Sequence, residues 1–105
     1  MVKMSDFDAD KLSRAVIVWT GYGTQACPTR EDTALVSICS AEEAARLATI
    51  VRALEEDFYK SDAHITAASL SEMKNAALSD FKRLHPELPS VIAEAFAWCY
   101  TFDYK

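Results

Sequence analysis

The chain has 105 residues, half of them hydrophobic and only two of them glycine, and its sixteen acidic and eleven basic side chains give a formal charge of −5. This length and composition predict a single folded domain over residues 1–105 and exclude a disordered chain. The negative charge disfavours nucleic-acid binding, which requires phosphates to be neutralised, and it equally disfavours an anionic membrane surface. A basic protein partner, in contrast, would be attracted.

Cys27, Cys39 and Cys99 are widely spaced and form no Cys-x-x-Cys pair. We therefore expect neither a disulfide framework nor a zinc site, and reduced buried thiols are the expected state. No stretch approaches about eighteen consecutive apolar residues, and no cationic leader precedes an apolar segment. These features predict a cytoplasmic protein, and no motif indicates a cofactor.

The first predicted helix lies near the start of the chain, where Asp8 or Asp10 is expected to cap it and Gly21 with Gly23 to end it. Its apolar residues share one helical face: Leu12, Ala15, Val16 and Trp19. The β-branched run at residues 16–18 makes a strand the competing interpretation.

Helix starts are further indicated by a serine or threonine followed three positions later by an acidic residue. These pairs are Thr29/Asp32 for a short helix within 28–38, Ser40/Glu43 for a helix over 41–60, and Ser69/Glu72 for a helix over about 70–85. Behind the two serines, apolar residues recur at helical spacing: Ala44, Leu47, Val51, Leu54 and Phe58, then Leu70, Met73, Ala77, Phe81 and Leu84. Pro86 cannot continue the last of these helices.

The last ten residues hold five of the eleven aromatic side chains, at alternate positions: Phe96, Trp98, Tyr100, Phe102 and Tyr104. A period of two is typical of a strand, whereas residues 92–97 favour a helix that begins near Ser90 and continues through about Thr101. We therefore predict an all-α bundle of four or five short helices. The alternative is an α+β fold, in which residues 15–20 and 97–103 pair as a two-stranded ribbon.

Catalytic residues are hard to find in this sequence. Asp62 and His64 follow the long predicted helix, and Cys27 offers a thiol, so a small enzyme or ligand-binding protein with an interhelical pocket is one hypothesis. Metal-binding loops, however, use closely patterned ligands that are missing here. A solvated turn and a structural cysteine are the favoured interpretations.

The leading hypothesis is a non-catalytic, acidic protein-binding module that inhibits or escorts a partner, for example a bacterial immunity or antitoxin-type inhibitor of a basic toxin. Within the aromatic segment, Trp98 and Phe102 are expected inside and the tyrosines nearer water. The candidate contact residues are Glu55, Glu56, Asp57, Trp98, Tyr100 and Tyr104. A third hypothesis is a homo-oligomer that buries its aromatic terminus against a second copy.

Overall fold

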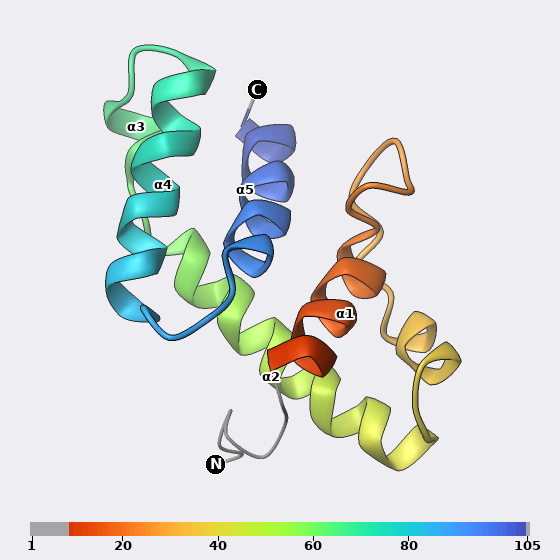
Figure 1. The fold of residues 1–105 in the computed structure, drawn as a ribbon. Coiled ribbons are helices and arrows are strands. Elements are labelled where there is room, and N and C mark those ends of the chain that lie inside the picture. The colour runs from red at the N-terminus through yellow and green to blue at the C-terminus, as the bar shows by residue number, and fades with distance from the viewer. Residues whose placement is uncertain (1–8, 105) are drawn as a thin grey trace.

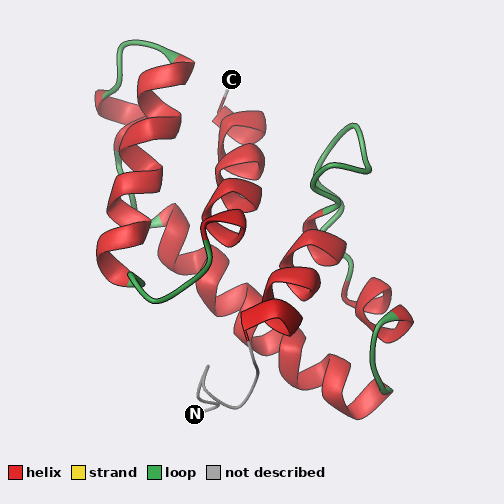
Figure 2. Ribbon diagram, in the orientation of Figure 1, coloured by secondary structure: helices red, strands yellow, loops and turns green. Residues whose placement is uncertain are grey.

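Five α-helices and one 3-10 helix form the secondary structure of residues 9–104, which are the residues that the computed structural model describes (Figures 1 and 2). Their bounds are α1 Ala9–Thr20, η2 Asp32–Ser37, α2 Ala41–Tyr59, α3 Ala63–Thr66, α4 Leu70–Leu84 and α5 Ser90–Tyr104. No strand occurs within this range, so the predicted all-α bundle is confirmed and the α+β ribbon is wrong. None of these helices is long and apolar enough to cross a membrane.

The C-terminal helix α5 occupies the centre of the fold. It packs against α4 on one side and α1 on the other, while the long helix α2 crosses behind them (Figure 1). Its buried residues are Ile92, Ala93, Ala95, Phe96, Ala97, Cys99 and Tyr100. A helix that is apolar on most sides is stable only when other elements surround it. The alternating aromatic residues therefore belong to a core helix, which continues to Tyr104 and not only to Thr101.

The two strong capping signals mark true helix starts. Ser40 Oγ accepts the Glu43 backbone N–H at 3.2 Å, and Ser69 Oγ accepts that of Glu72 at 3.1 Å. The Glu43 carboxylate instead forms an ion pair with Lys11, at 2.6 Å, which joins α2 to α1. Both helices end one residue earlier than predicted.

The first helix is also confirmed, and it ends where the glycines are. Gly21 and Gly23 have φ angles of 81° and 82°, a region that L side chains rarely adopt, so the chain can leave the helix there. Asp10 lies inside the first turn of α1, and Asp8 lies outside the described residues.

A short helix follows as predicted, but Thr29 does not cap it. The Thr29 hydroxyl donates to the Trp19 carbonyl at 2.9 Å, while the N-cap residue, Glu31, makes no side-chain cap bond. Asp32 accepts a hydrogen bond from Trp19 Nε1 at 2.8 Å. The predicted cap is wrong because Thr29 ties residues 21–31 back to the end of α1.

Candidate binding surface

The three acidic residues expected to contact a partner do not form one patch. Glu55, Glu56 and Asp57 follow one another on α2, and successive helical residues point about 100° apart. Glu55 pairs with Arg30 at 2.7 Å, whereas Asp57 accepts from His85 Nε2 at 2.9 Å on another side of the helix. Glu56 is exposed. Two of the three acids thus join elements of the fold.

Tyr100 is fully buried, so the expectation that it lies nearer water is wrong. Its hydroxyl donates to the Ser61 carbonyl at 2.9 Å and accepts the His64 backbone N–H at 3.0 Å. A buried tyrosine is stable when its hydroxyl has partners of this kind. Phe102 was expected inside, but it is 37 % exposed and belongs to the surface.

The His64 side chain also contacts this hydroxyl. His64 Nδ1 lies 2.7 Å from the Tyr100 oxygen. The Tyr104 ring stacks on His64, with centroids 4.1 Å apart and an interplanar angle of 16°. Burial raises the pKa of Tyr100, which keeps this hydroxyl neutral.

A second polar cluster joins residues 21–31 to α2 and to the last turn of α5. Arg30, with a positive φ of 51°, contacts Glu55 at 2.7 Å, the Tyr59 hydroxyl at 2.8 Å and Asp103 at 2.6 Å. Tyr59 also donates to Asp103 at 2.5 Å. Burial, together with the hydrogen bond to Asp103, raises the pKa of Tyr59, so the phenol stays neutral. An acid in the last turn opposes the helix dipole, and Arg30 offsets that cost.

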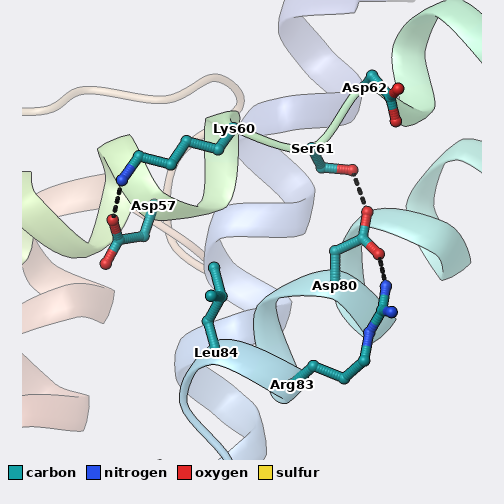
Figure 3. Close-up of a pocket in the computed structure, with 7 residues that line it drawn as sticks. All are labelled: Asp57, Lys60, Ser61, Asp62, Asp80, Arg83 and Leu84. Carbon is teal, nitrogen blue, oxygen red and sulfur yellow. Dashed lines mark hydrogen bonds and ion pairs between the residues drawn. The ribbon is translucent and has the colours of Figure 1, made fainter.

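A pocket of about 440 Å³ lies between the end of α2 and α4 (Figure 3). It is lined by Asp57, Lys60, Ser61, Asp62, Asp80, Arg83 and Leu84. The carboxylates of Asp57 and Asp80 lie on different sides of the pocket (Figure 3). Asp57 is bonded to Lys60, just after α2, and Asp80 to Arg83 of α4.

The residues considered as catalytic candidates in the sequence have different surroundings in the structure. Asp62 lines this pocket but His64 does not, and the described residues contain no group of three or more His, Cys, Asp or Glu placed to hold a metal ion. Cys27 is exposed, so the expectation of a buried thiol is wrong there, while Cys99 is buried and burial raises its pKa to about 12. Both histidines have other partners, Tyr100 and Asp57.

Exposed apolar side chains gather instead at one end of the bundle, where α3, the first turn of α4 and the last turn of α5 meet (Figure 1). Of the six large hydrophobic residues that the described chain exposes, four are there, with exposed fractions of 75 % for Ile65, 50 % for Leu70, 37 % for Phe102 and 42 % for Tyr104. Together with half-buried Trp98 we call them the apolar end.

A small open pocket lies within this surface. Leu70, Trp98, Thr101 and Phe102 line it, and its volume is about 190 Å³. Tyr22, just after α1, contacts Trp98, with the two ring centroids 5.8 Å apart. Of the predicted contact residues, Trp98 lines this pocket, whereas the Tyr104 ring stacks on His64 and lies 4.8 Å from that of Tyr100.

The sequence pattern does not indicate that Ile65, Leu70 and Phe102 lie on the surface. Leu70 and Phe102 fit the apolar stripes of their helices, and such stripes predict core positions. The one available signal for Ile65 was that it is a single large apolar residue in the polar segment 60–66.

No protein-family model, no curated protein and no solved structure matches this chain.

Proposed function

We propose that this protein is a non-catalytic binding module that holds a partner protein at its apolar end and thereby inhibits or escorts that partner. The observation that carries the proposal is the concentration of Ile65, Leu70, Phe102 and Tyr104 at one end of a small fold. Soluble proteins rarely keep large contiguous apolar patches exposed unless the patch binds something. Aromatic side chains beside a pocket are also the usual anchors of protein interfaces.

The polar side chains near this surface support binding over catalysis. Arg30 is bonded to both Glu55 and Asp103, and the Tyr100 hydroxyl is bonded to backbone groups. Groups used in this way hold helices together, whereas a catalytic acid or base must be able to exchange a proton with a substrate.

An acidic inhibitor of a basic partner remains the concrete form of this proposal. The formal charge of −5 favours the approach of a basic protein. A bacterial immunity or antitoxin-type protein would fit this description.

The test is affinity capture from the lysate of the source cells. The wild-type protein should retain one stoichiometric partner, and the double variant Leu70→Ser/Phe102→Ser should lose it. Val36→Ser and Leu84→Ser are matched controls, because they remove exposed apolar side chains outside the apolar end and should leave capture unchanged. Circular dichroism should show that all variants keep their helices. Equal capture by wild type and double variant, or no partner at all, would contradict the proposal.

A further inference from the structure

We infer that the apolar end receives a cationic amphipathic helix, which inserts one large apolar side chain between α4 and α5 and places lysine or arginine beside the end of α5. This inference rests on the proposed function and adds the chemistry of the partner segment.

The pocket fits one large apolar side chain. Trp98 and Phe102 are four residues apart on α5, so they lie on the same helical face, and Leu70 of α4 lines the same pocket. A cavity of about 150 Å³ is large enough for benzene. The observed volume of about 190 Å³ therefore suits a phenyl ring or a branched aliphatic side chain. Tyr104 and Ile65 are exposed at the same end of the bundle but do not line the pocket.

The need to satisfy the backbone hydrogen-bonding groups of the partner segment favours a helix. A strand from a partner would need an exposed sheet edge to satisfy its N–H and C=O groups, and residues 9–104 contain no strand. A helix satisfies its own backbone and can present apolar side chains at spacings of three and four.

Among the described residues, acidic side chains predominate beside the last turn of α5. The C-terminal pole of α5 lies there, and its last turn contains Asp103 and no basic residue. Asp103 and Glu55 share one guanidinium, that of Arg30, so this cluster keeps an excess negative charge. Asp62, at the start of α3, is exposed.

Two further charges narrow the choice of partner. Lys74 lies one turn along α4 from Leu70, so the partner's cations belong on the side of α3 and α5. A second copy of this chain would bring another net charge of −5 to the contact. A cationic helix is therefore favoured over self-association.

Two synthetic peptides of about 18 residues, long enough to form a helix, serve as probes. Both carry leucine at spacings of three and four, with lysine at all other positions in one peptide and glutamate in the other. Trp98 fluorescence reports binding, because the second tryptophan, Trp19, is only 2 % exposed. The lysine peptide should shift the Trp98 emission. It should bind at least about tenfold more tightly than the glutamate peptide, and its binding should weaken as salt is added.

Two pairs of variants locate the contact. Phe102→Ser should weaken binding of the lysine peptide by about tenfold, while Val36→Ser should not change it. Asp62→Asn should weaken binding roughly two- to fivefold, while Glu42→Gln, at the opposite end of α2, should have no effect.

Equal binding of the two peptides, or binding that ignores Phe102→Ser, would overturn the inference. So would concentration-dependent sedimentation of the protein alone that Phe102→Ser abolishes, because a second copy would then cover the apolar end. If a partner captured from lysate depends on Leu70 and Phe102 but the lysine peptide is not preferred, the inference fails and the proposed function stands.

Discussion

Residues 92–100 and residues 101–104 belong to the same helix, yet they have different surroundings. In the first part, where α1, α2 and α4 pack against α5, Phe96 and Tyr100 are fully buried. In the last turn, Phe102 and Tyr104 reach the end of the bundle and are exposed. One aromatic pattern thus supplies residues to both the core and the candidate binding surface. The neighbouring elements determine which of these residues are buried and which are exposed.

The largest effect on stability should come from Phe96→Ala in the buried part. Phe96 packs against Phe58 and Phe81, with ring centroids 6.1 Å and 6.0 Å away, so truncation leaves a cavity in the core. We expect the free energy of unfolding to fall by about 3–5 kcal/mol, measured by chemical denaturation. Phe102→Ala should cost less than about 1 kcal/mol. Equal costs would remove the distinction between the two parts of α5.

Tyr100→Phe should have the next largest effect. It removes the hydroxyl that bonds to the Ser61 carbonyl and the His64 N–H and leaves those groups without that partner. The expected loss of stability is about 1–3 kcal/mol. Tyr104→Phe is the matched control in the exposed turn and should change stability by less than about 0.5 kcal/mol. A neutral Tyr100→Phe would mean that the hydroxyl contributes little.

Arg30→Ala tests how the last turn is held. Arg30 joins Glu55 and Asp103, but its side chain is 31 % exposed and solvent screens these ion pairs. We therefore expect a loss of only about 1 kcal/mol. Arg52→Ala, which removes the more exposed pair with Asp32, should cost a few tenths of a kcal/mol. If Arg52→Ala is less stable than Arg30→Ala, the Arg30 cluster does not hold the last turn of α5.

The smallest effect on stability should come from Asp57→Asn. Asp57 lies on α2 and bonds to His85, away from the last turn of α5. Burial alone would raise the pKa of Asp57, but hydrogen bonds from His85 and Lys60 outweigh it and lower the pKa below its ordinary value of 3.8. A carboxyl whose pKa is lowered by folding stabilises the fold at pH values above the pKa that it has in the unfolded chain. This contribution is lost as the pH falls through the pKa of the carboxyl in the folded protein.

Denaturation of Asp57→Asn at several pH values tests this contribution. The variant should be less stable than wild type by under about 1 kcal/mol near pH 5, and the difference should vanish near about pH 2. A difference that grows on acidification would contradict this assignment.

The sequence predicted the helices well because their signals are local. Ser40 and Ser69 cap helices through bonds that span three residues, and glycines end α1 as expected. The burial of Tyr100 and the exposure of Phe102 could not be predicted from such local signals. Tyr100 is buried because its hydroxyl meets residues 61–64, some 36 to 39 positions away in the chain. Leu70 and Phe102 carry core-like patterns, and only the packing of α3, α4 and α5 shows that the fold ends beside them.

Native-state hydrogen exchange along α5 tests the central claim most directly. If residues 95–100 form the centre of the fold, their amides should exchange only through global unfolding, with the protection and denaturant dependence of the whole domain. The amides of residues 102–104 should exchange through local opening at much lower free energy. Uniform protection along α5, or fast exchange at Phe96 and Tyr100, would contradict the division of this helix into a buried part and an exposed turn.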